Sequence, residues 1–206
     1  MRRILFIAIL AASTAVLADG RGISRVNGDI HAQAGQAYGD LETVNGAIVV
    51  DAGVAADEVE TVNGSVRLGD GAKAASVEVV NGEVELGANV EITNTIETVN
   101  GAVSIGAGSH IGRHIETVNG TIELRSTTVG RNVETVNGDI VIGTGSIVRG
   151  DLIVHEPKGI SIGNKRKPKV TIEAGATIEG KLDLRREVEL QLDPDAKVGQ
   201  VLNVER

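Results

Sequence analysis

A glutamate recurs at one position of a repeated segment, at intervals of 18 or 19 residues. The six members of this column are Glu42, Glu60, Glu78, Glu97, Glu116 and Glu134. Stacked together, their carboxylates would form an oxygen-rich array suited to calcium, magnesium or a basic partner. The calcium-roll repeat Gly-Gly-x-Gly-x-Asp is absent from the sequence, so we predict no defined metal site and take the column as a candidate interaction face. The residues by themselves favour the simpler interpretation, a solvated acidic face that discourages lateral aggregation.

Other residue types used in catalysis are scattered. The four histidines, His31, His110, His114 and His155, fall in different sectors of the repeat. His110 and His114 are four residues apart, a spacing that shares a face only on a helix. A phosphate loop is absent from the sequence. We therefore expect solvated loop histidines, no catalytic residue and no cofactor.

Threonine forms a further column next to the glutamates. Its members are Thr43, Thr61, Thr98, Thr117 and Thr135, with Val79 in the remaining copy. An ice-binding face would need two exposed threonine columns, whereas the adjacent column here is glutamate or valine. We therefore interpret these residues as β-branched strand packing.

The elements that would position these columns follow from an Asn-Gly repeat. The asparagines are Asn27, Asn45, Asn63, Asn81, Asn100, Asn119 and Asn137. Apolar residues recur in three columns, which are Leu41, Val59, Val77, Ile96, Ile115 and Val133; Ile48, Val66, Val84, Val103, Ile122 and Ile140; and Val50, Leu68, Leu86, Ile105, Leu124 and Ile142. The second and third columns lie two residues apart, as in a strand with one buried face. A repeat this short cannot bury its own core, so neighbouring copies must stack.

We therefore predict an all-β fold, a single-chain parallel β-helix with coils of 18 or 19 residues and a preference for the right hand. A third side of a triangular cross-section is indicated by Val54, Val90, Ile111, Val129 and Ile147. A meander of β-hairpins is the competing interpretation of Asn-Gly. The constant period and the short strands favour coiling.

At each Asn-Gly, we expect the chain to turn by using positive φ angles, which glycine adopts at little cost. The asparagines would then stack at about 4.8 Å, the strand spacing. Buried in the turn, they would form an amide ladder between coils.

The organisation along the chain has three parts. Residues 1–18 carry Arg2 and Arg3, an apolar run and Val16-Leu17-Ala18, which together predict a signal peptide cleaved after Ala18. Residues 19–150 are the regular repeats, and residues 151–206 are degenerate coils and a cap within the same domain. We expect export to the periplasm, the cell surface or the exterior of a bacterium, and no integral membrane segment after cleavage.

The charge balance bears on partners. The formal net charge is -8, and loss of Arg2 and Arg3 makes the mature chain more anionic. Nucleic acid is therefore a poor partner. The one concentrated basic segment, Lys165-Arg166-Lys167 with Lys169, is expected to be an exposed loop, with contact to an anionic envelope surface as the alternative.

Two short motifs resemble known families. Val136-Asn137-Gly138-Asp139-Ile140 resembles the core repeat of exported bacterial proteins of the adhesin type, over roughly residues 23–142. The segment from Ile172 to Gly180 resembles the repeats of bactofilins, which are polymer-forming right-handed β-helices. Bactofilins are cytoplasmic scaffolds, and the export signal predicted here departs from that pattern.

These observations favour a non-catalytic exported β-solenoid that acts as a rigid cell-envelope component or adhesin-like interaction module. Its partner would be an envelope or surface component of unknown identity, and self-association is an open alternative in the form of end-to-end polymerisation. The enzymatic alternatives are a hexapeptide-type acyltransferase and a polysaccharide-active β-helix. The two-apart columns and the 19-residue copies disagree with the first of these.

Overall fold

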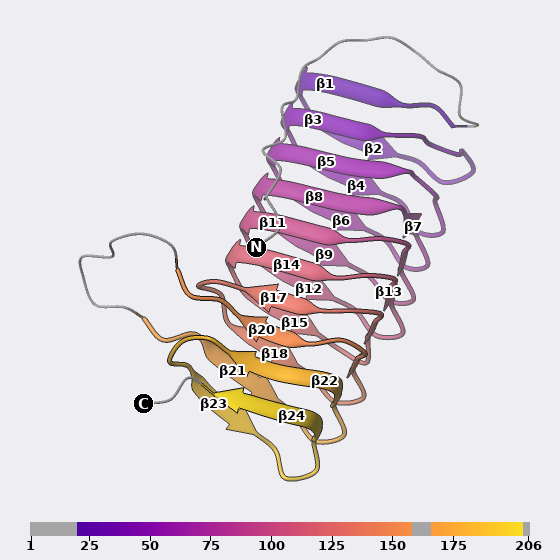
Figure 1. Cartoon of the computed structure of the whole chain (residues 1–206). Helices are drawn as coiled ribbons and strands as arrows, with labels where there is room; N and C mark the ends of the chain where they lie inside the picture. Colours follow the sequence, from indigo (N-terminus) through magenta and orange to yellow (C-terminus); the bar gives the residue numbers. More distant parts are fainter. Residues whose placement is uncertain (1–19, 158–165, 204–206) are drawn as a thin grey trace.

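The chain folds into a parallel β-solenoid of about nine turns (Figure 1). The structure is a computed structural model that describes residues 20–157 and 166–203, so the predicted signal peptide and Lys165 lie outside the described residues. Within those two ranges no helix occurs, and hence none that could cross a membrane. The predicted all-β solenoid is confirmed.

Most turns contribute one short strand to each of three sides. In the first two described turns, side 3 is represented by isolated bridges at Ala37 and Ala55. Side 1 contains β1 (Ile23–Asn27), β3 (Leu41–Asn45), β5 (Glu58–Asn63), β8 (Ser76–Asn81), β11 (Ile96–Asn100), β14 (Ile115–Asn119), β17 (Val133–Thr135) and β20 (Leu152–Val154). Side 2 contains β2 (Ile30–Ala32), β4 (Ile48–Val50), β6 (Val66–Leu68), β9 (Val84–Leu86), β12 (Val103–Ile105), β15 (Ile122–Leu124), β18 (Ile140–Ile142), β21 (Lys169–Ile172) and β23 (Glu189–Leu192). Side 3 contains β7 (Lys73–Ala74), β10 (Glu91–Ile92), β13 (His110–Ile111), β16 (Thr128–Val129) and β19 (Ile147–Val148).

The last two turns connect two of these sides. Strand β22 (Thr177–Leu184) pairs with β19 through its first residues and with β20 through its last, so it continues around the corner from side 3 to side 1. Strand β24 (Lys197–Asn203) follows β22 with a register shift between Ile178 and Lys181. Sides 1 and 3 therefore belong to one 15-stranded sheet.

The three predicted apolar columns form the core. Their members are at most 3% exposed, because the two-apart spacing places all of them on the inner face. The residues predicted for side 3 do not form one column, which corrects that part of the prediction. Val54 and Val90 precede the side 3 strands, Ile111 and Val129 lie in them, and Ile147 points outward while Val148 is buried.

Glycine is required at the Asn-Gly corner by the close approach of neighbouring coils. A Cβ added to Gly64 would overlap the carbonyl oxygen of Gly46 in the preceding coil, and Gly101 stands in the same relation to Gly82. Positive φ is not the common cause, because Gly46, Gly64, Gly101 and Gly138 do not adopt it. Gly28, Gly82 and Gly120 do have positive φ at this corner. The other positive-φ residues lie in the turn between sides 2 and 3, at Gly35, Gly53, Gly71, Asn89, Gly108, Ser126, Gly145 and Gly175.

The two ends of the solenoid differ. In the first coil, Ile30 and Ala32 are fully buried, and Tyr38 accepts a hydrogen bond at 2.8 Å from the Gln33 amide. In the last coil, Leu192 and Val201 occupy inward positions but are each 42% exposed. The core is therefore incompletely covered at its C-terminal end.

Replacing Gly64 with alanine should destabilise the solenoid, because the new methyl group would have to push the backbones of two coils apart. Overpacking of this kind costs about 1–3 kcal/mol. The urea midpoint followed by far-UV circular dichroism measures the loss. Ser65→Ala, at the exposed next position, is the matched control. Equal midpoints for the two variants would contradict the close-approach explanation.

Candidate functional site

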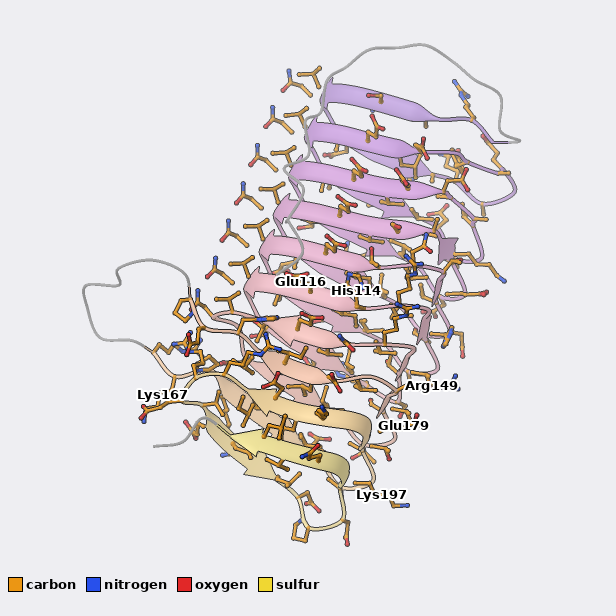
Figure 2. All side chains as sticks on the ribbon, in the orientation of Figure 1. His114, Glu116, Arg149, Lys167, Glu179 and Lys197 are labelled. Atoms are coloured by element: carbon orange, nitrogen blue, oxygen red, sulfur yellow. The ribbon has the colours of Figure 1, made fainter. Side chains whose placement is uncertain are left out.

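The glutamate column lies on the outer face of side 1. Neighbouring strands pair in register, so Glu42 lies beside Glu60, Glu60 beside Glu78, and so on to Glu134. Each glutamate lies between two buried residues of its strand and is itself half-buried. Figure 2 shows Glu116 and His114 next to each other on this face. Parallel pairing places successive side chains about 4.8 Å apart.

Apolar residues flank the glutamates on one side and further acidic residues on the other. On the side of the Asn-Gly corner is a valine column of half-buried side chains, Val44, Val62, Val80, Val99, Val118 and Val136. On the other side lie Asp40 and Glu58, each one residue before the first buried residue of side 1 in its coil. Their carboxylates add negative charge to the first coils. The outer face of side 1 therefore combines an acidic stripe with an apolar stripe.

Stacked charges on the other two sides are of opposite sign. Arg67 Nε lies 2.8 Å from Glu85 Oε2 on side 2, and Lys73 Nζ lies 2.7 Å from Glu91 Oε2 on side 3. Such cross-strand pairs are mildly stabilising, whereas like charges placed opposite one another are destabilising. Side 1 is thus the face on which the chain accumulates carboxylates.

This accumulation changes the acidity of the column. Burial, followed by the charges of Glu78, Glu58, Glu42 and Asp40, raises the pKa of Glu60 to about 7. Burial also raises the pKa of Glu78, with added repulsion from Glu97 and Glu58. Part of this stretch therefore holds protons near neutral pH.

Farther along the column, histidine compensates the negative charge. His114 Nε2 lies 3.3 Å from Glu97 Oε1, and this hydrogen bond lowers the pKa of Glu97 and raises that of His114. Burial still raises the pKa of Glu116, together with the charges of Glu134 and Glu97. Within the described ranges, the ion pairs of the column are those with His114 and His155.

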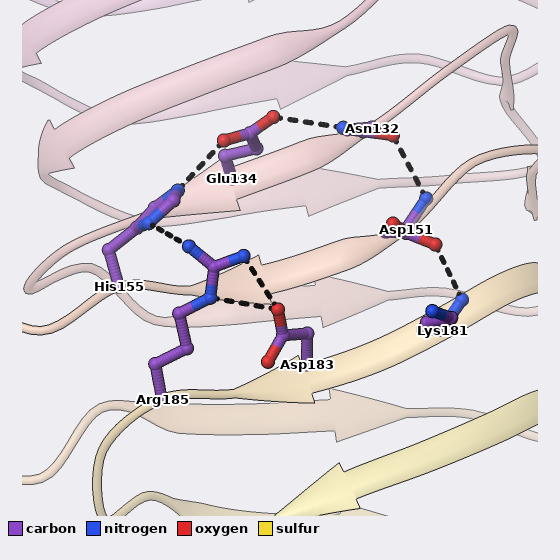
Figure 3. Close-up of polar contacts among 7 residues, drawn as sticks. All are labelled: Asn132, Glu134, Asp151, His155, Lys181, Asp183 and Arg185. Atoms are coloured by element: carbon purple, nitrogen blue, oxygen red, sulfur yellow. Dashed lines mark hydrogen bonds and ion pairs between the residues drawn. The ribbon is translucent and has the colours of Figure 1, made fainter. Parts of the chain in front are cut away.

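A polar network ends the column at its C-terminal side (Figure 3). His155 Nε2 lies 2.8 Å from Glu134 Oε2, and Asn132 Nδ2 donates to Glu134 Oε1 at 3.0 Å. Arg185 lies 3.3 Å from His155 Nδ1 and forms an ion pair of 2.7 Å with Asp183. In the next coil after Glu134, the register position of the glutamates is occupied by Ile153, and then by Asp183.

The expectation of solvated loop histidines fails in two ways. His31 and His110 are solvated but lie in strands β2 and β13. His155 is buried and His114 is partly buried, and each pairs with a glutamate of the column. His31 and His110 are exposed, and His31 pairs with Asp51 at 2.7 Å. The acidic partners of His31, His114 and His155 lie 17 to 21 residues away in the sequence. A search for acidic residues close in sequence therefore could not find them.

The amide ladder is present, but it lies on the surface. Each asparagine Nδ2 donates to Oδ1 of the asparagine one coil earlier, at 2.9–3.0 Å, from Asn45→Asn27 to Asn137→Asn119. All seven side chains are exposed, so the expected burial is wrong. Arg186 Nη1 donates to Asn137 Oδ1 at 2.8 Å and places a cation at the acceptor end of the ladder.

The threonine column points inward, which confirms strand packing. Thr43 and Thr61 donate to the carbonyl oxygens of Gly28 and Gly46 in the preceding coil, at 3.2 and 3.0 Å. Thr98 Oγ1 and Thr117 Oγ1 are buried without a hydrogen-bond partner. Buried hydroxyls cannot form an exposed flat array.

The basic segment is largely paired in its described part. Arg166 contacts Asp139 at 2.5 Å, and Lys167 lies 2.9 Å from Glu187. Lys167 and Arg186 also line a cavity of about 390 Å³ together with Glu156, Pro157 and Glu187. These pairs leave little free positive charge for an anionic surface at Arg166 and Lys167.

No set of three metal-ligating side chains converges on one point in the described ranges. The arrangement can nevertheless take up protons and attract cationic groups along a line. Comparisons with known proteins add no assignment, because no family model, no curated protein and no solved structure matches the chain.

Replacing Asn81 with alanine should cost more stability than the same change at Asn27. Asn81 donates one ladder bond and accepts another, whereas Asn27 accepts one. A net contribution of about 1 kcal/mol per hydrogen bond predicts about twice the loss for Asn81→Ala. Urea midpoints of the two variants measure it. Equal losses would indicate that the ladder contributes no stability beyond that of each single turn residue.

Proposed function

We propose that this protein is a non-catalytic exported β-solenoid that serves as a rigid cell-envelope component or adhesin-like interaction module. Side 1 is its interaction face. The observation that carries the proposal is the in-register glutamate column, which repeats one acidic group along the rod. The motif resemblance to exported adhesin-type repeats agrees with this role but supplies no partner.

Rigidity is supported by the contacts between coils. Backbone hydrogen bonds join neighbouring turns on all three sides, and the amide ladder adds side-chain bonds at one corner. A module of this kind keeps its surface groups at fixed spacing. Fixed spacing lowers the entropy cost of binding a partner at several points.

The chemistry of side 1 indicates the partner class. A row of carboxylates beside a row of valines suits a surface with repeated cationic groups and some apolar character. Electrostatic attraction of exposed charges weakens with salt, since the screening length is about 10 Å at 0.1 M. Binding through this face should therefore be salt-sensitive.

Neutralising the column should weaken binding to isolated bacterial envelope fragments. The variant is Glu60→Gln, Glu78→Gln and Glu116→Gln, and co-sedimentation at low and physiological salt measures binding. Roughly 0.5 kcal/mol per charge predicts about a tenfold loss of affinity at low salt.

The matched control changes three carboxylates that lie outside side 1, namely Glu83→Gln, Glu85→Gln and Glu123→Gln. At pH 8.0, above the raised pKa of Glu60 of about 7, it removes the same number of carboxylates and should retain binding. If both triple variants weaken binding equally, general charge and not side 1 is responsible. Failure of the unmodified protein to bind envelope fragments would contradict the proposed function.

A second candidate function, end-to-end polymerisation, is favoured by the C-terminal coil. Leu192 and Val201 are the exposed members of columns that are otherwise buried, and strands β23 and β24 have no further coil beyond them within the described residues. Apolar surface together with unpaired strand edges is a template for pairing with another chain. Such a contact could propagate into a filament.

Leu192→Lys should abolish assembly if this second function holds. Sedimentation velocity over a wide concentration range, with negative-stain images of the same samples, measures it. Val49→Lys, which places the same charge on side 2, should leave assembly unchanged. One discrete species at every concentration would exclude polymerisation, and assembly unaffected by Leu192→Lys would exclude this end as its contact.

A further inference from the structure

We propose that the first part of the glutamate column is a proton-responsive element, in which proton uptake by Glu60 and Glu78 stabilises β3, β5 and β8. The inference concerns the stability of these coils and does not depend on the interaction role proposed above.

The geometry makes neighbouring carboxyl groups interact in one of two ways. Glu42, Glu60 and Glu78 stand in register on adjacent parallel strands, so their spacing is set by the backbone at about 4.8 Å. Two ionised carboxylates held this close repel each other. A protonated carboxyl group can instead donate a hydrogen bond to its ionised neighbour. One proton therefore converts a repulsive pair into an attractive one.

Among the residues that the structure describes, no cation offsets this repulsion in the first coils. The charged groups that face Glu60 are Glu58 on its own strand, Glu42 and Asp40 from the preceding coil, and Glu78 from the next, where Ser76 also lies. All four charged groups are acidic. The histidines and Arg185 that compensate the column lie from Glu97 onward.

Half-burial strengthens the effect. Desolvation is the largest cause of the raised pKa of both Glu60 and Glu78. Unfolding returns these glutamates toward their ordinary pKa of 4.5, so between 4.5 and about 7 the folded state binds more protons than the unfolded state. Stability must therefore rise as the pH falls through this window.

The later coils also gain stability on acidification, through Glu116, whose pKa is raised by burial, and through His114. His114 has a raised pKa, so its contribution is fully present below 6.5 and is lost as the pH rises through its folded value. Glu97 has a lowered pKa, so its contribution is lost on acidification below 4.5. The hydrogen bond with His114 therefore keeps Glu97 ionised at pH values at which Glu60 is protonated.

Amide hydrogen exchange at pH 8.0 and pH 5.5, corrected for intrinsic rates, tests the proposal strand by strand. Protection of β3, β5 and β8 should rise at least about threefold at pH 5.5, a value already reduced for solvent screening of half-exposed groups. Glu60→Gln, which imitates the protonated group, should give this higher protection at pH 8.0 and should diminish the pH response.

Glu85→Gln is the matched control, because it removes a carboxylate paired with Arg67 on side 2 of the same part of the rod. It should leave the pH response of β3, β5 and β8 unchanged. Protection of these strands that is constant or falls at pH 5.5 would overturn the proposal. So would a Glu60→Gln variant that is less protected at pH 8.0, or a Glu85→Gln variant that loses the pH response.

Discussion

The in-register stacking of neighbouring coils is the constraint on which the rest of the structure depends. Because the pairing is parallel and the period nearly constant, most side chains lie directly beside the same position of the next coil. The stability of each column therefore depends on how its residue type interacts with copies of itself in the neighbouring coils. The backbones approach most closely at the Asn-Gly corner, where only glycine fits between coils.

Self-interaction separates the columns into favourable and unfavourable ones. Valine, isoleucine and leucine pack on copies of themselves, and asparagine carries both a donor and an acceptor, so its amide can bond to the next in a continuous direction. Ionised glutamate offers acceptors alone. A proton gives it the missing donor, which makes protonated glutamate resemble asparagine in this setting. Histidine supplies the donor instead at Glu97 and Glu134.

Much of the fold could be predicted because it repeats. The period fixed the stacking, and the two-apart spacing identified the inner columns of sides 1 and 2. The corner could not be predicted, since alternation along Leu41, Thr43 and Asn45 suggests a third inward residue, whereas the turn carries Asn45 to the surface. The strands of side 3 were more difficult to predict, because two residues are too few to show an alternation of buried and exposed positions.

The site was predicted as a set of residues but not as an electrostatic system. The alignment of the glutamates follows from the period. Their compensation does not, because His114 and His155 occupy different sectors of the repeat and reach Glu97 and Glu134 across coils. Proximity along the chain is a poor guide to these contacts, because the paired residues are 17 and 21 positions apart in the sequence.

The columns also end differently at the C-terminal side, which separates two kinds of contact. The amide ladder ends on Arg186, and the glutamate column ends in the network of His155 and Arg185. The inner apolar columns continue to Leu192 and Val201 without such an ending among the described residues. A contact at this end would rest on apolar burial and respond weakly to salt, whereas a contact on side 1 would rest on carboxylates and respond strongly to salt and pH. The two modes of association can therefore be distinguished by how strongly each depends on salt concentration and pH.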